Sequence, residues 1–269
     1  MMSPQNMLMN MHMVGVMYAP AERVTLGVMA NYNKNNMRMW IKTSLESDMV
    51  DHEHNHPGMD HSNSNTETPV LTQMNAEGLG NVHVSGLYRV LFNASHCLHT
   101  IAGITLRPGN VETTETSKGH EHGVHTETGL LSPFLGVNYS RLFSRYLIGA
   151  QVLYSVPVHL RNSVYASAAL YEFNVWGSRK LARWLSTSIR IRGFYHTAPV
   201  GAIEAVMSTA QNLYTIEYYL LEAAAGVNMM PYRRWRFGVE VGIPAIQWNK
   251  NVGMNKTWFA VAGMQFMIH

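Results

Sequence analysis

Two clusters of histidine are the residues of this chain best suited to chemistry. They consist of His52, His54, His56 and His61, and of His120, His122 and His125, with carboxylates interspersed in both. Imidazole nitrogen is a good ligand for Cu(II), Zn(II) and Ni(II). A His-x-His-x-His run indicates metal binding but selects no particular metal. The alternative interpretation is that both clusters lie in solvated loops whose metal affinity is incidental. The only cofactor that the sequence suggests is therefore a Cu, Zn or Ni ion.

A second soft-ligand signal comes from methionine, of which the chain has 19. The residues that share one face of a predicted strand are Met7, Met9, Met11, Met13 and Met17. Thioethers select Cu(I), so an inward row would form a ladder for a soft ion. On the other face, Asn10 and His12 should prefer the interior, because polar side chains facing lipid cost free energy. We therefore expect the methionines to face outward as ordinary apolar residues.

Charged residues on three consecutive predicted strands form a third group. Their parity predicts that they face the lumen of a barrel, and they are Arg190, Arg192, Glu222, Arg236 and Glu240. One interpretation is a charged passage that favours anionic solutes. The interpretation we favour is a set of paired charges that lock the strands together.

Hydrolase chemistry finds little support in the sequence. A lipase-type site needs a serine hydrogen-bonded to a histidine that a third group orients. Polar residues at 159–163 and Cys97, which lies between His96 and His99, are the nearest candidates. Both groups fall in predicted connections, where such residues are common. We expect that the protein is not an enzyme, and a hydrolase is the weakest alternative.

The composition limits the elements that can hold these residues. Apolar residues make up 46% of the chain and charged residues 14%, against about 25% charged residues in soluble proteins. No run approaches the ~18 apolar residues of a membrane helix. A transmembrane β-barrel satisfies both observations, because its apolar residues occur at every second position. The net charge of +3 comes without a basic stripe, which excludes nucleic-acid binding.

Period-2 alternation recurs along the whole chain and predicts eleven antiparallel strands. We place them at about 6–17, 23–33, 80–92, 98–106, 133–142, 146–156, 165–176, 184–195, 215–229, 235–243 and 256–268. The connections alternate between short and long, as periplasmic turns and external loops do in transmembrane barrels. Aromatic residues near strand ends, Trp176 and Trp248 among them, fit interfacial girdles. The prediction is a single β-barrel domain over 1–269, with long external loops at 34–79, 107–132 and 196–214. A soluble sandwich or lipocalin-like barrel is the alternative.

The odd strand count has a consequence for the N-terminus. Bacterial single-chain barrels normally have an even number of strands. The first residues also lack the cationic start and apolar core of a signal peptide. We expect a full barrel of about 12 strands, with one strand and the signal preceding Met1.

Several segments carry the motifs of one known family. The segment from Met11 to Pro20 resembles its Met-His-Met and Met-Tyr-Ala-Pro stretch, and 23–26 its Leu-Thr-Leu. Residues 78–82 resemble its Gly-Leu-Gly-Asp strand entry, with Asn81 in place of Asp, and 106–109 its loop entry. Segments 133–139 and 239–247 also fit. Together these segments resemble a family of outer-membrane transporters, which is itself similar to barrels of the meta-pathway of phenol degradation. The end of the chain departs from outer-membrane barrels, because three residues follow Phe266 where an aromatic residue usually closes the chain.

The resemblance implies a barrel of the bacterial outer membrane with a role in transport, and it supplies no substrate. We expect outer-membrane lipid as one partner and a small solute or metal ion as the other. A copper-like metal is the leading cargo, or the ligand of the external loops. The alternative is a barrel that binds metal at the cell surface and conducts nothing.

Overall fold

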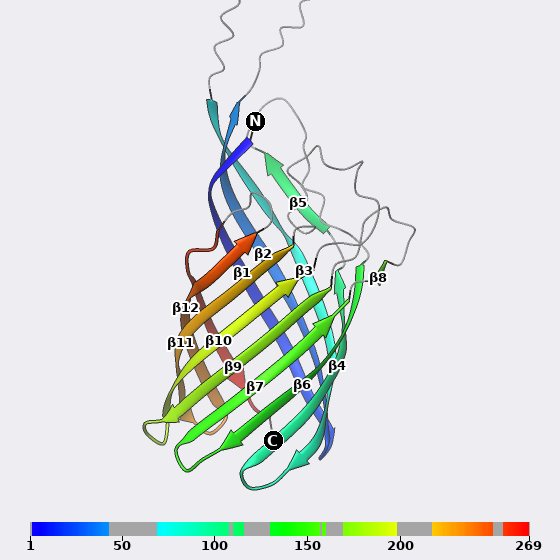
Figure 1. Ribbon diagram of the computed structural model, residues 1–269, viewed down its shortest axis with the longest axis vertical. Coiled ribbons are helices and arrows are strands. Elements are labelled where there is room, and N and C mark those ends of the chain that lie inside the picture. The colour runs from blue at the N-terminus through cyan, green and yellow to red at the C-terminus, as the bar shows by residue number, and fades with distance from the viewer. Residues whose placement is uncertain are drawn as a thin grey trace, which may run out of the picture.

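The computed structural model describes residues 2–42, 69–107, 110–115, 130–156, 158–159, 169–197, 217–249 and 255–268. All regular structure in these ranges is β-strand, arranged as one sheet of tilted strands that curls around an interior (Figure 1). None of the described residues forms a helix long and apolar enough to cross a membrane. The predicted all-β antiparallel fold is confirmed.

Eleven strands form the path of the sheet, and each pairs antiparallel with the next along the chain. The first six are β1 (Met2–Ala21), β2 (Val24–Lys42), β3 (Pro69–Phe92), β4 (His96–Arg107), β6 (Leu130–Leu142) and β7 (Tyr146–Ser155). The other five are β9 (Leu170–Lys180), β10 (Leu185–His196), β11 (Tyr218–Tyr232), β12 (Trp235–Asn249) and β13 (Phe259–Phe266). Two short strands lie off this path: β5 (Asn110–Glu115) pairs with β3, and β8 (Val158–His159) pairs with β6.

The strands extend into regions that the sequence assigned to loops. β2 and β3 occupy both ends of the predicted loop 34–79, where Lys34 pairs with Glu77 in register and their side chains approach to 3.3 Å. These polar stretches lack apolar alternation, because paired strands that project beyond the lipid do not need it. Within the predicted loop 107–132, the β5 residues pair with β3 and the last three residues belong to β6.

Other predicted boundaries also move. β9 begins at Leu170 and ends at Lys180, whereas the sequence predicted 165–176. The shift arises because the polar end of β9, from Gly177 on, carries no alternation to mark it. In the predicted loop 196–214, the first residue still belongs to β10.

The outer face of the sheet is apolar and ends in an aromatic row. Directly paired residues across β7, β9, β10, β11 and β12 place five rings side by side: Tyr154, Tyr171, Tyr195, Tyr219 and Trp248. Ring centroids are 4.8 Å apart between the first two and 6.1 Å apart between the next two. Such a row matches the interfacial girdle of a transmembrane barrel.

Below this row, large aliphatic side chains project outward from most strands of the sheet. Ile189 is 69% exposed, Val16 69% and Leu135 64%, while Ile101 is the one buried hydrophobic side chain among the described residues. A soluble domain buries its large aliphatic residues in a core. An apolar belt with no core behind it requires an apolar solvent, which is the lipid of a membrane.

Strand register connects the two halves of the inner face. One row of directly paired residues crosses β7, β9, β10 and β11 through Gln151, Asn174, Arg192 and Glu222. Ser155, four residues after Gln151, shares its face and starts a second row through Phe134, Gly103, Ser85, Gly27 and Met17. The inner face therefore runs unbroken from β11 to β1.

Rings that lie over glycines fill part of the interior. A Cβ atom on Gly149 would lie 2.2 Å from the ring of Trp176, and one on Gly103 would lie 2.4 Å from the ring of Phe134. Both positions require glycine, because an aromatic ring from the neighbouring strand occupies the space that a side chain would need. Trp176, which the sequence assigned to an interfacial girdle, is thus an inner-face residue.

Candidate functional site

The inner face of β9 to β12, with the segment before β13, gathers charged side chains that we call the charged wall. The charged wall consists of Glu172, Arg190, Arg192, Glu222, Arg236, Glu240 and Lys256. The structure places all five of the residues predicted to face the lumen on this one face, namely Arg190, Arg192, Glu222, Arg236 and Glu240. It adds two residues, Glu172 and Lys256.

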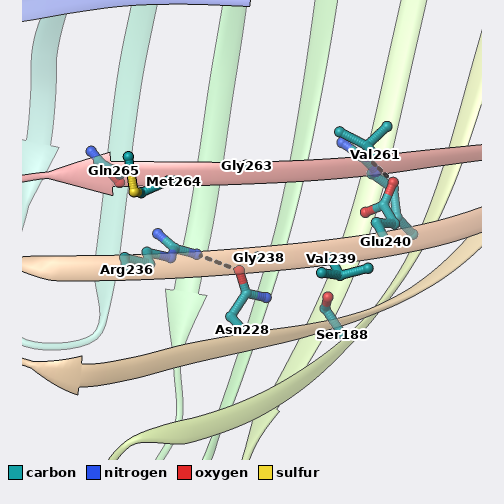
Figure 2. Close-up of a pocket in the computed structure, with 11 residues that line it drawn as sticks. Ser188, Asn228, Arg236, Gly238, Val239, Glu240, Val261, Gly263, Met264 and Gln265 are labelled. Carbon is teal, nitrogen blue, oxygen red and sulfur yellow. Dashed lines mark hydrogen bonds and ion pairs between the residues drawn. The ribbon is translucent and has the colours of Figure 1, made fainter. Parts of the chain in front are cut away.

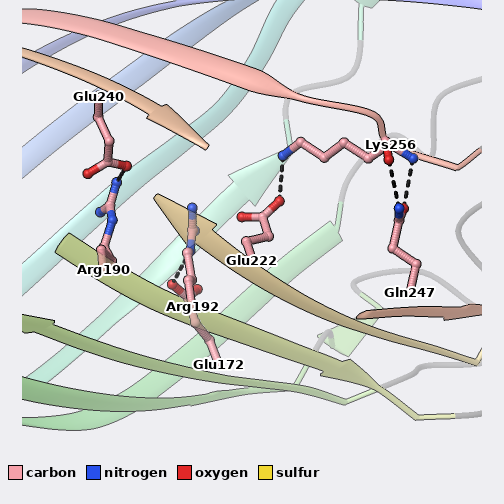
Figure 3. Close-up of polar contacts among 7 residues, drawn as sticks. All are labelled: Glu172, Arg190, Arg192, Glu222, Glu240, Gln247 and Lys256. Atoms are coloured by element: carbon pink, nitrogen blue, oxygen red, sulfur yellow. Dashed lines mark hydrogen bonds and ion pairs between the residues drawn. The ribbon is translucent and has the colours of Figure 1, made fainter. Parts of the chain in front are cut away.

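Ion pairs join the strands across the charged wall (Figure 3). Arg190 of β10 contacts Glu240 of β12, so this pair passes over β11. Gly226 of β11 lies directly opposite Glu240, and a Cβ there would stand 3.1 Å from the Ser188 hydroxyl. Because Gly226 has no side chain, Arg190 and Glu240 can meet over β11. Arg192 donates from Nε to Glu172 Oε1 at 3.0 Å.

Glu222 is the most deeply buried member of the charged wall, with its side chain 2% exposed. Lys256 donates from Nζ to Glu222 Oε1 at 2.5 Å. Gln247 holds Lys256 in place: its Oε1 accepts from the Lys256 amide at 2.7 Å, and its Nε2 donates to the Lys256 carbonyl at 2.6 Å. A buried carboxylate is costly unless it is paired, so Gln247 and Lys256 together stabilise Glu222.

The sequence contained a signal for one of the two added residues. Glu172 shares the parity of Asn174 within a predicted strand, so period-2 reasoning could have placed it inward. Lys256 lies outside any strand in the structure, three residues before β13. Its position follows from the hydrogen bonds to Gln247, which alternation does not encode.

A hollow of about 300 Å³ opens at the end of the charged wall, between β10, β11, β12 and β13 (Figure 2). Arg236 projects at its side and donates to Asn228 Oδ1 at 3.2 Å. Gly238 and Gly263 face each other across β12 and β13. A Cβ on Gly263 would meet nothing within 4 Å, so this position faces open space. The hollow thus has charged sides and a bare backbone floor.

The methionines of β1 also lie on the inner face, and the expectation that they face lipid is wrong. Met13 pairs with Asn31 and Met17 with Gly27, both on the inner face. The prediction assumed that Asn10 and His12 face the interior. They lie instead on the outer face beside Lys34 and Tyr32, level with the exposed Lys34–Glu77 ion pair. That part of the strand projects beyond the apolar belt, so polar side chains face water there.

The predicted histidine ligands lie outside the described residues. This holds for His52, His54, His56 and His61 and for His120, His122 and His125. The strand ends that flank these segments lie at one end of the sheet, opposite the short turns (Figure 1). Within the part of the chain that the structure describes, no group of three or more His, Cys, Asp or Glu residues could hold a metal ion.

No protein-family model and no curated protein matches the sequence of this chain. Among solved structures, it is similar to an outer membrane channel from Pseudomonas putida F1, with a TM-score of 0.54 and 9% sequence identity. That match covers 96% of this chain and 83% of the channel. At this identity the likeness shows the fold, which is that of the bacterial outer-membrane β-barrels.

Two further solved structures are also similar to this chain. One is a loop-deletion mutant of OmpT from Vibrio cholerae, with a TM-score of 0.44, 10% identity and 99% coverage of both chains. The other is a FadL homologue from Pseudomonas aeruginosa, with a TM-score of 0.39, 9% identity and coverage of 96% of this chain and 66% of that one. The likeness to the Pseudomonas putida channel supports the resemblance drawn from the sequence as far as an outer-membrane barrel. The relation to phenol-degradation barrels stays a prediction.

Proposed function

We propose that this barrel of the outer membrane is a channel that admits a small polar solute. The observation that carries the proposal is the contrast between its two faces. The outer face is apolar and ends in an aromatic row, while the inner face carries the charged wall and an open hollow. A polar interior inside an apolar belt is the arrangement of a water-filled pore.

The ion pairs of the charged wall give the proposed passage a fixed lining. Three glutamates pair with two arginines and one lysine on the inner face, and each pair has at least one member whose side chain is less than one fifth exposed. Pairing of this kind keeps the side chains against the wall and out of the lumen. Arg236 stands beside the hollow and contacts the neutral amide of Asn228. A solute that carries negative charge is therefore favoured at this point.

Conductance of the full chain in planar lipid bilayers tests the proposal. The informative variant is Gly263→Trp, which sends a large ring into the open space of the hollow. A tryptophan side chain has about 200 Å² of surface and would occupy much of this hollow of about 300 Å³. We therefore expect the single-channel conductance to fall. The matched control is Ala260→Trp, since Ala260 pairs with the exposed Val241 on the outer face, away from the hollow, and should leave conductance unchanged. A folded barrel that conducts nothing, or equal effects of both variants, would contradict the proposal.

The finer part of the proposal is that the histidine clusters bind a divalent metal at the external mouth. It rests on residue type and spacing, since imidazoles beside carboxylates suit Cu(II), Zn(II) and Ni(II). Isothermal calorimetry of the detergent-refolded chain with each ion tests it. The comparison protein carries alanine at His52, His54, His56, His61, His120, His122 and His125.

Tight binding that saturates at one or two ions and vanishes in the alanine protein is the expected result. Weak binding without saturation, or binding that survives the alanine changes, would mean that these histidines form no specific metal site. The conductance test is independent of this outcome, because it depends on residues of the sheet.

A further inference from the structure

Methionine is sorted to one face of the first two strands. Every methionine of β1 and β2 whose side chain the structure describes lies on the inner face, and we call this group the methionine wall: Met7, Met9, Met11, Met13, Met17, Met29 and Met37. The apolar outer positions of β1 are Leu8, Val14, Val16 and Tyr18 instead. A role limited to hydrophobicity would put methionine among these lipid-facing residues. Its place on the face that meets water calls for another role.

The methionine wall carries no charged side chain among its described neighbours on β1 and β2. The inner residues of β2 opposite Met13, Met11 and Met9 are Asn31, Asn33 and Asn35. The charged residues of these strands, Lys34 and Arg38, have the opposite parity and point outward. The wall therefore offers thioether sulfur and amide groups only, unlike the charged wall across the interior.

Three of these methionines flank two glycines on adjacent strands. Met29 lies directly opposite Gly15, and an ideal Cβ on Gly15 would touch its Cβ and Cγ at 3.4 and 3.5 Å. Met17 lies opposite Gly27, with its Cγ 3.9 Å from the ideal Cβ of that glycine. Met13 flanks Gly15 on the other side. Diagonal neighbours on a sheet are about 7–8 Å apart, within reach of long side chains. Met13, Met17 and Met29 can therefore bring their sulfur atoms to one point above Gly15.

An imidazole borders this group of sulfur atoms. His83 of β3 lies directly opposite Met29 on the inner face. A hydrogen bond of 2.9 Å between His83 Nδ1 and Thr105 Oγ1 fixes the orientation of the ring. The three thioethers and this ring belong to three adjacent strands, so the sheet itself sets their spacing.

We propose that Met13, Met17 and Met29, with His83 beside them, form a binding site for a soft monovalent cation, Cu(I) or Ag(I), on the inner wall of the barrel. Thioether ligands select soft ions over the hard cations that carboxylates and carbonyl oxygens prefer. Met7, Met9 and Met11 continue the row toward the external end of the barrel. They provide weaker binding positions between that end and the site. The inference goes beyond the proposed channel function, because it adds a cation site on the wall away from Arg236, and it rests on that function only for passage, not for binding.

The test is a calorimetric titration of the detergent-refolded chain with silver nitrate in chloride-free buffer. All proteins carry Cys97→Ser, because a thiol would bind Ag(I) more strongly than any thioether. The variant replaces Met13, Met17 and Met29 by leucine, which keeps apolar volume and removes sulfur. The matched control replaces Met229 and Met264 by leucine. Both lie on the outer face, where they pair with Phe237 from the two strands that flank β12.

We expect the affinity of the tightest Ag(I) site to fall by about tenfold or more in the inner variant and to stay unchanged in the outer control. Equal affinities in the inner variant and the parent protein would overturn the proposal. A measurement on the parent protein avoids dependence on variant folding. Bound Ag(I) should protect Met13, Met17 and Met29 from oxidation by peroxide, as mapped by mass spectrometry, and should leave Met264 unprotected. Equal oxidation of all four with and without Ag(I) would also overturn it.

The conductance measured for the same proteins separates the two proposals. Conductance without sulfur-dependent Ag(I) binding would retain the channel and reject the soft-cation site. Sulfur-dependent binding in a barrel that conducts nothing would retain the site and reject the channel.

Discussion

The charged wall and the methionine wall line one interior with opposite chemistry. The charged wall on β9 to β12 consists of arginine, lysine and glutamate side chains held in cross-strand pairs. The methionine wall on β1 and β2 consists of thioethers that face asparagine and glycine. The first wall is fixed by electrostatic pairing, whereas the second keeps flexible side chains whose sulfur atoms can turn toward a ligand. A single sheet thus separates the residues that stabilise the barrel from those best suited to bind a soft ion.

The largest effect on stability should come from breaking the most buried pair of the charged wall. Lys256→Met leaves the Glu222 carboxylate, 2% exposed, without its cation. Removing one partner of a buried pair costs about 3–5 kcal/mol. Lys34→Met is the matched control, because its partner Glu77 is 50% exposed, and surface pairs contribute about 0–1 kcal/mol. Urea unfolding in lipid vesicles measures both. Equal losses would contradict the distinction between a locking pair and a surface pair.

Ion selectivity should respond to the charged wall and not to the methionine wall. Arg236→Gln removes a cation from the side of the hollow, so permeation should shift toward cations. Met13→Leu changes no charge and should leave the reversal potential in a KCl gradient unaltered. A shift of similar size in the leucine variant would mean that the charged wall alone does not set the ion selectivity.

The smallest effect on stability is expected from the methionine wall. Leucine at Met13, Met17 and Met29 conserves volume and hydrophobicity, and swaps of this kind usually cost less than about 1.5 kcal/mol each. The same urea titrations would show this. A loss as large as that of Lys256→Met would indicate that the methionines are structural, like the paired charges.

Alternation was sufficient to predict the fold, because lipid on one side and an interior on the other impose the period of two directly. The strand path and the shared face of Arg190 and Glu240 follow from that period. It failed where lipid no longer acts. Beyond the belt, polar strands such as Asn33 to Arg38 pair without apolar alternation, and their sequence resembles a loop.

The methionine prediction failed for the same reason. Asn10 and His12 were assigned by a rule that holds in lipid, yet they lie on the part of β1 that projects past it. Lys256 escaped prediction because two side-chain to backbone hydrogen bonds with Gln247, not a strand, position it. The histidine clusters remain predictions from residue type, since they fall outside the described residues.

Thiol accessibility tests most directly that the two walls share one water-filled interior. Single cysteines at Met13 and Val14, in a Cys97→Ser background, differ by one position on β1 and by face. With the barrel in lipid vesicles, a membrane-impermeant maleimide should label Met13→Cys rapidly and Val14→Cys slowly. The same contrast is expected on β10, with rapid labelling of Arg190→Cys and slow labelling of Ile189→Cys. Rapid labelling of Val14→Cys with protection of Met13→Cys would contradict the account, because it would place the methionine wall against lipid.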